Sequence, residues 1–89
     1  MPFLMCKHRV PDFELFKKTL REHAEAHAAN GMRAQKVWRC IDDAQSVFFV
    51  FEVTDLTKAK AMLVNLAARA KAGSPGEFPE MVLVEETPF

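Results

Sequence analysis

Three histidines are the side chains of this sequence best suited to chemistry, and two of them share a helical spacing. His23 and His27 lie four residues apart in a segment with helical periodicity, so their imidazoles should project from one helix face. His8 lies in a strand-like run, on the same predicted strand face as Cys6. An imidazole titrates near neutral pH and can take a proton from an acidic carbon or a phenol. His8 and His23 are therefore candidate catalytic acid–base groups, and His27 is a candidate substrate-binding residue.

The helical pair could also bind a metal ion, because two imidazoles one turn apart can share one. A zinc or iron site normally adds a carboxylate or a third ligand at a fixed spacing, and the sequence shows neither around His23 and His27. We therefore predict no metal ion and no cofactor. In a purely structural role, His23 would line the edge of the core and His27 would lie at the solvent boundary. Whether His23 faces a pocket or lines the core edge, His27 is expected to be the wetter of the two residues.

An aromatic wall for a small apolar molecule could come from Trp38, with Phe16 and Phe48 beside it. These three side chains are the remaining candidate substrate-binding residues. The alternative is that Trp38 is simply part of the core, because an aromatic residue in a strand of a small domain usually serves packing.

Strand and helix patterns alternate along the chain. A predicted helix at 13–29 begins after Asp12, a good N-cap, and ends at Asn30-Gly31, where either residue can adopt the left-handed conformation of a helix end. A second predicted helix begins after Asp55 and stops at Gly73, followed by a loop at 74–76. The predicted strands cover residues 3–10, 32–41, 47–53 and 81–85. The element order is therefore β-α-β-β-α-β.

This order predicts an α+β fold of the ferredoxin-like type, formed by residues 1–89 as a single domain. Right-handed crossovers and a tight hairpin favour a four-stranded antiparallel sheet, with the first and third strands central and two helices on one face. The second strand carries three basic residues, which suit an exposed edge.

The apolar pattern of the third strand predicts that a second protein surface covers the sheet. Val47, Phe49 and Phe51 point to one face, but Phe48 and Val50 point to the other, so both faces are apolar. Two helices can cover only one face, and several exposed phenylalanines would be costly, at roughly 1.5–3 kcal/mol each. We therefore expect a homodimer that packs sheet against sheet. The alternative is a monomer with one apolar face exposed.

Several segments resemble the dimeric α/β-barrel superfamily, and more closely its small uncharacterised members related to antibiotic-biosynthesis monooxygenases. The similar segments are residues 8–16, the turn Asp42-Asp43, the run 47–52 and the helix start at 55–59. The resemblance implies the ferredoxin-like fold, the dimer and a pocket between the helices and the concave sheet. Proteins of that superfamily include cofactor-free oxygenases, haem-degrading enzymes, lactone isomerases and stress-induced proteins.

Two departures from that pattern bear on the chemistry. Small relatives often carry Trp where this chain has Phe16, and Phe where it has Leu20. The chain also contains no tyrosine, so a mechanism that relies on a phenol cannot be transferred to it.

Composition excludes some classes of function. Lys and Arg balance Asp and Glu at twelve each, which argues against a nucleic-acid partner. No apolar stretch is long enough to span a membrane, and the first residues do not resemble a signal peptide. The two cysteines, Cys6 and Cys40, lie in apolar runs without metal-ligand spacing, which indicates free thiols. These features predict a soluble cytoplasmic protein.

The sequence names no reaction and leaves open whether the protein is an enzyme. The first hypothesis is a homodimer that binds an aromatic or apolar metabolite, as a candidate cofactor-independent monooxygenase or isomerase. The alternative is a non-catalytic stress-response or regulatory module that binds a ligand or a partner protein.

Overall fold

The computed structural model describes residues 2–72 and 79–88 of the chain. The elements follow one another as β1 (Pro2–Arg9), α1 (Phe13–Glu22), α2 (Ala24–Ala29), β2 (Met32–Arg39), β3 (Ser46–Val53), α3 (Leu56–Ala72) and β4 (Glu80–Glu85). The predicted strands are confirmed to within two residues at each end. The predicted stop at Gly73 and the predicted loop at 74–76 lie outside the described residues.

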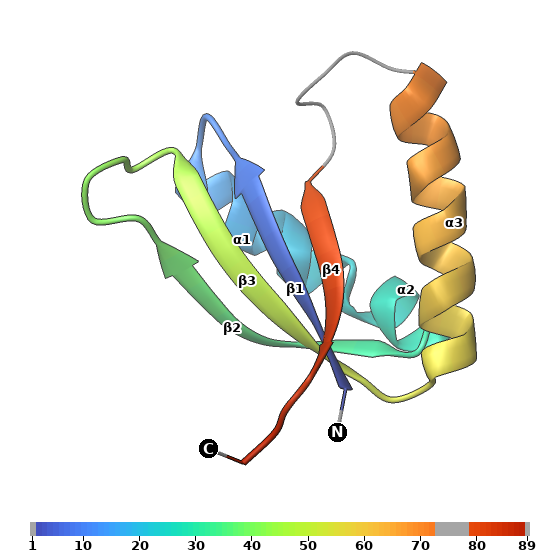
Figure 1. Ribbon diagram of the computed structural model, residues 1–89. Helices are drawn as coiled ribbons and strands as arrows, with labels where there is room; N and C mark the ends of the chain where they lie inside the picture. Colours follow the sequence, from blue (N-terminus) through green and yellow to red (C-terminus); the bar gives the residue numbers. More distant parts are fainter. Residues whose placement is uncertain (1, 73–78, 89) are drawn as a thin grey trace.

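The four strands form one antiparallel sheet in the order β2-β3-β1-β4 (Figure 1). The prediction that the first and third strands are central and the second lies at an edge is therefore confirmed. In the register, Leu4 pairs with Phe51 and Cys6 with Phe49. On the other side of β1, Cys6 pairs with Met81 of β4. The arrangement is ferredoxin-like.

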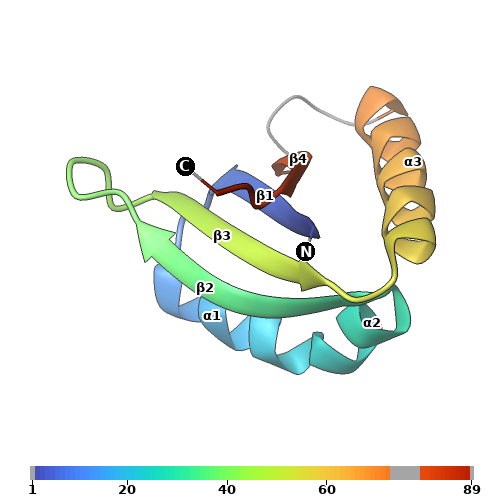
Figure 2. The same cartoon turned by 60° about the horizontal axis from the view of Figure 1, so that its bottom comes forward.

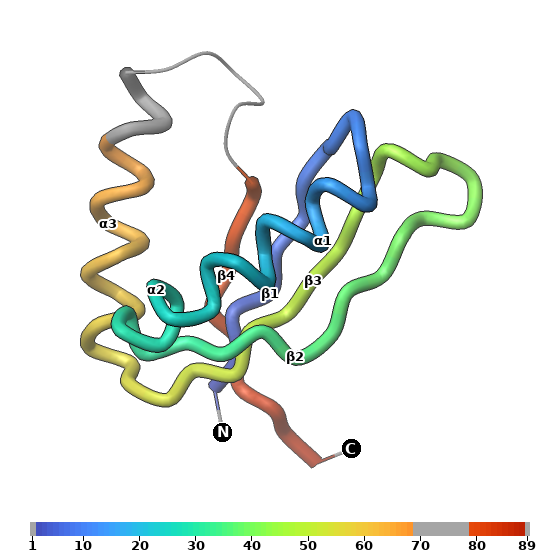
Figure 3. The backbone as a smooth tube through the Cα atoms, turned by 180° about the vertical axis from the view of Figure 1, so that it is seen from behind, coloured from blue at the N-terminus to red at the C-terminus, as the bar shows by residue number. Residues whose placement is uncertain are grey.

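The predicted helix at 13–29 is present but is broken at His23 into α1 and α2. Asp12 caps α1 as predicted, because its Oδ1 accepts a hydrogen bond from the backbone N–H of Leu15 at 3.0 Å. At His23 the backbone leaves helical geometry, with φ −95° and ψ 12°. The bend directs α2 against β2, so both short helices follow the twisted sheet and cover one of its faces (Figures 1 and 3).

Gly31 anchors the start of α3 next to the end of α2. Its φ is 75°, in the left-handed region that glycine tolerates, as the predicted helix end requires. Its carbonyl accepts hydrogen bonds from the backbone N–H groups of Thr54 and Asp55, at 2.7 and 3.2 Å. A Cβ atom at this position would lie 2.6 Å from the backbone oxygen of Asp55. Asp55 in turn caps α3, accepting from the N–H of Lys58 at 3.1 Å.

Helix α3 stands to one side of the sheet rather than flat on its covered face (Figures 1 and 2). Ala59 is fully buried, and Met62 and Leu63 pack partly against the core. Val64, on another side of the same helix, is 70% exposed. The predicted placement of the helices on one face is therefore confirmed, although the first predicted helix is divided in two: α1 and α2 cover that face, and α3 packs against its side.

The two faces of the sheet are both apolar, as β3 predicted. On the face covered by α1 and α2, called here the inner face, the buried core contains Leu4, Cys6, Val47, Phe49, Phe51 and Val53. On the other, outer face, Met5, Trp38, Phe48 and Val82 are all more than a third exposed. No helix among the described residues covers the outer face (Figure 1).

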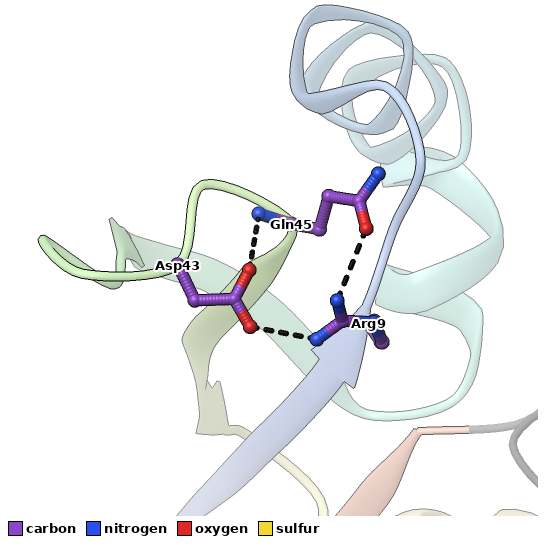
Figure 4. A network of polar contacts seen from close by, with 3 residues as sticks. All are labelled: Arg9, Asp43 and Gln45. Atoms are coloured by element: carbon purple, nitrogen blue, oxygen red, sulfur yellow. Dashed lines mark hydrogen bonds and ion pairs between the residues drawn. The ribbon is translucent and has the colours of Figure 1, made fainter.

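A polar network ties the β2–β3 hairpin to the end of β1 (Figure 4). The Arg9 guanidinium donates to Asp43 Oδ2 at 2.6 Å and to Gln45 Oε1 at 3.1 Å. Asp43 Oδ1 also accepts from the backbone N–H of Gln45, at 3.1 Å. The hydrogen bond from Arg9, followed by that from Gln45, lowers the pKa of the Asp43 carboxyl. The predicted polar turn is thus a structured loop that ties the closed end of the hairpin to β1.

Candidate functional site

A pocket lies between the inner face of the sheet, the helices α1 and α2, and the side of α3. Its volume is about 330 Å³, within the range of small-molecule sites. The polar lining residues are His8, Thr19, His23 and His27. The apolar lining residues are Leu4, Phe16, Leu20, Met32, Phe49, Phe51, Met62, Leu66, Pro79 and Met81. The described chain therefore brings all three histidines to one apolar pocket.

His27 is the more shielded member of the helical pair. Its ring meets the ring of Phe51 edge-on, with centroids 4.9 Å apart. Its Nδ1 is buried and has no hydrogen-bond partner among the described residues. Desolvation, and then the charge of nearby His23, lowers the pKa of His27. The imidazole of His27 is therefore held in its neutral form near neutral pH.

His23 occupies the break between α1 and α2 and is exposed. Its ring centroid lies 6.3 Å from that of His27, with the two rings nearly perpendicular. The prediction that His27 is the wetter residue is thus wrong. The bend at His23 turns the following helical turn toward the sheet, which moves His27 onto Phe51 and leaves His23 at the mouth of the pocket.

His8 lies at the opposite end of the pocket. It shares a strand face with Cys6, as predicted; this is the inner face, and His8 pairs across the sheet with Val47. Leu4 and its partner Phe51, which contacts His27, are four residues further along the strands, or about 13 Å at the rise of a β-strand. Burial lowers the pKa of His8. The two candidate acid–base groups, His8 and His23, therefore face the pocket from different ends.

The predicted aromatic wall does not form. Phe16 lines the pocket, with its ring centroid 5.1 Å from that of Phe49. Trp38 and Phe48 pair with each other across β2 and β3 but lie on the outer face, 45% and 38% exposed. A β-bulge between Ala34 and Lys36 explains this placement, because one extra residue moves every later side chain of β2 to the opposite face.

The cysteine beside the pocket is not suited to nucleophilic chemistry. Cys6 is buried next to the inner-face residues, and this burial raises the pKa of its thiol to about 12. The thiolate, which is the nucleophile and metal ligand, is therefore disfavoured at neutral pH. Among residues 2–72 and 79–88, no three side chains of His, Cys, Asp or Glu are grouped closely enough to hold a metal ion.

Some lining residues were not identified from the sequence. Thr19 precedes His23 by one helical turn and His27 by two, so the spacing that singled out the histidines also contains Thr19. Met62 and Leu66 belong to α3, and their presence depends on where that helix stands. No sequence signal places an amphipathic helix beside a sheet rather than on it.

The comparisons with known proteins support the fold. No protein-family model and no curated protein matches the chain. The chain is similar in structure to a crystal structure of an uncharacterized NIPSNAP domain protein from Burkholderia xenovorans, with a TM-score of 0.59 and 21% sequence identity. The match covers 100% of this chain and 97% of the other. At this identity the similarity establishes the ferredoxin-like fold alone.

The helices of the described residues do not have the combination of length and hydropathy of a membrane span. Within the described ranges, none of them is both long and apolar enough to cross a bilayer.

Proposed function

We propose that this protein binds a small apolar or aromatic metabolite in the pocket between the inner sheet face and the helices. The observation that carries the proposal is the pocket itself: an apolar lining with a few convergent polar groups is the usual composition of a small-molecule site. Three methionines in the lining, Met32, Met62 and Met81, give it an adaptable surface.

As an enzyme, the protein would act as a cofactor-independent monooxygenase or isomerase. Its resemblance to small proteins related to antibiotic-biosynthesis monooxygenases supports this reaction class, and the imidazoles of His8 and His23 would be the acid–base groups. A neutral imidazole within hydrogen-bond reach of an acidic C–H or O–H can remove that proton. Phe16 and His27 would hold the substrate.

One observation favours a non-catalytic binding or regulatory module instead. His8 and His23 face the pocket from different ends, so they do not converge on one reacting atom. Convergence of an acid–base group with a second positioned group is what proton transfer in an active site needs. Binding without turnover therefore remains the second candidate function.

We further propose that the protein is a cytoplasmic homodimer, joined through the outer face. Support comes from two exposed apolar pairs, Trp38 with Phe48 across β2 and β3 and Met5 with Val82 across β1 and β4. Together they give the outer face an apolar surface of the kind that marks protein interfaces. Cys6 and Cys40 are both free, which fits a reducing compartment.

The binding proposal is tested with N-phenyl-1-naphthylamine, a neutral fluorophore whose emission rises in apolar surroundings. We expect saturable emission with the native protein. Leu66→Trp, which fills the pocket from α3, should abolish it. Val64→Trp is the matched control, because Val64 lies on the same helix but is exposed and does not line the pocket. Equal emission with native protein and Leu66→Trp, or no saturable emission at all, would contradict the proposal.

A further inference from the structure

The polar groups of the pocket are unevenly distributed, which bears on the ligand. His23 and His27 lie together at one end, 6.3 Å apart between ring centroids, and Thr19 lies one turn before them on the same helix. His8 is at the other end, and apolar side chains line the space between. The pocket thus has a polar end with two imidazoles and a long apolar body.

The ionisable side chains of the lining also restrict the kind of ligand that the pocket can bind. Among the described lining residues there is no Asp, Glu, Lys or Arg, so imidazole is the only ionisable group that a ligand meets. The described part of the lining therefore offers no carboxylate to pair with a cationic ligand. An imidazolium, by contrast, forms a strong charge-assisted hydrogen bond with an anionic oxygen.

We propose that the pocket selects ligands with an apolar body and a single carboxylate, and that His23 and His27 bind the carboxylate. This inference rests on the proposed function and specifies its ligand class. The carboxylate oxygens can accept from one nitrogen of each ring, while the apolar body lies along Leu4, Phe49 and Met81 toward His8.

Binding of the anion is coupled to protonation of His27. Desolvation, and then the neighbouring His23, lowers the pKa of His27 and so favours its neutral form. A carboxylate beside the rings favours the charged imidazole, so the complex takes up a proton from solvent. Affinity for the carboxylate therefore falls as pH rises through the range in which His27 is protonated in the complex. Affinity for a neutral ligand does not.

The test compares 1-naphthoate with 1-naphthamide, which have the same ring system and nearly the same size. Each displaces N-phenyl-1-naphthylamine from the protein at about pH 6 and about pH 8, on either side of the histidine range. We expect 1-naphthoate to bind about tenfold more tightly than the amide at the lower pH, since a hydrogen bond to a charged group is worth that order. The preference should be lost at the higher pH.

The variants locate the carboxylate. His23→Gln and His27→Gln should each remove the preference for 1-naphthoate while still binding the neutral fluorophore. Arg21→Gln is the control for charge, because it removes a positive charge from the same helix and does not line this pocket. It should keep the preference. Loss of the preference in Arg21→Gln, or in His8→Gln alone, would overturn the assignment.

The outcomes separate the two proposals. If the fluorophore binds but the acid and the amide displace it equally, or neither displaces it, the carboxylate inference fails and the binding function stands. If the fluorophore does not bind, the proposed function itself fails.

Discussion

Both faces of the sheet carry large apolar side chains, but they differ in what covers them. On the inner face, Phe49 and Phe51 are buried under α1 and α2, with their ring centroids 5.8 Å apart. On the outer face, Phe48 and Trp38 form an equally apolar pair that no described helix covers.

The comparison shows that burial along β3 depends on the surroundings of each side chain and not on its type. Adjacent phenylalanines in one strand, Phe48 and Phe49, are 38% and 6% exposed. The inner face also contains the pocket, so its packing is incomplete where a ligand would lie. No described helix covers the apolar surface of the outer face, and a second copy of the chain is therefore proposed to pack there.

The largest expected effect comes from placing the same charge on each face in turn. Phe49→Asp would bury an unpaired carboxylate, at a cost of several kcal/mol, which is a large part of the stability of a small domain. We expect this variant either to be insoluble on expression or, if soluble, to show the circular dichroism spectrum of an unfolded chain.

Phe48→Asp is its counterpart on the outer face. We expect it to fold, since a carboxylate can reach water there, and to sediment as a monomer, whereas the native chain sediments as a dimer. A folded, soluble Phe49→Asp would show that the inner-face assignment is wrong. A native chain that remains monomeric at micromolar concentration would remove the proposed outer-face interface.

An intermediate effect is expected at Gly31, which holds α3 against the inner-face side. Gly31→Ala places a Cβ 2.6 Å from the backbone oxygen of Asp55 and imposes a positive φ on alanine, a strain of about 1–3 kcal/mol before any relaxation. We expect a lower denaturant midpoint and weaker binding of N-phenyl-1-naphthylamine, because α3 contributes Met62 and Leu66 to the pocket.

Self-association through the outer face is the property that Gly31→Ala should not change. Gly31→Ala should leave self-association unchanged, because Gly31 lies just before β2, whereas Trp38 and its partner Phe48 lie near the far end of that strand. Loss of the dimer together with loss of ligand binding would mean that the two faces are not independent.

The smallest expected effect concerns pH. Burial lowers the pKa of His8 and of His27 in the folded protein, both on the inner face. The unfolded chain therefore binds protons first as the pH falls below about 6.5, and stability decreases from there until the folded-state pKa values are reached. We expect the denaturant midpoint to fall between about pH 7.5 and about pH 5.5.

His27→Gln provides the comparison, because glutamine does not titrate in this range. Its midpoint should depend less on pH than that of the native protein. The same pH dependence in both would show that His27 is not desolvated in the folded state.

Much of the fold could be predicted from residues that act locally. Asp12 and Asp55 cap helices as their positions indicated, Gly31 adopts the left-handed conformation, and the apolar run of β3 is a central strand. Alternation along β1 also correctly placed His8 and Cys6 on one face. These features depend on a few neighbouring residues, so the local pattern is sufficient.

Other features of the site depend on contacts that are distant in the sequence. The helix breaks at His23 because it follows a twisted sheet, which the local sequence pattern does not indicate. This break makes His27, rather than His23, the more shielded of the two histidines. The bulge between Ala34 and Lys36 moved Trp38 away from Phe16. The alternation of side chains along a strand does not indicate where a β-bulge inserts an extra residue into that strand.

The sequence could therefore specify the order of the elements, the ends of the helices, and three histidines on faces that could meet. Only the packed chain decided that these histidines share one pocket, that two of them lie together and one apart, and that the tryptophan faces away. The physical reason is that periodicity sets the direction of a side chain within its own element. The position of one element relative to another is set by the non-local pairing of strands and by the burial of surfaces that the elements share.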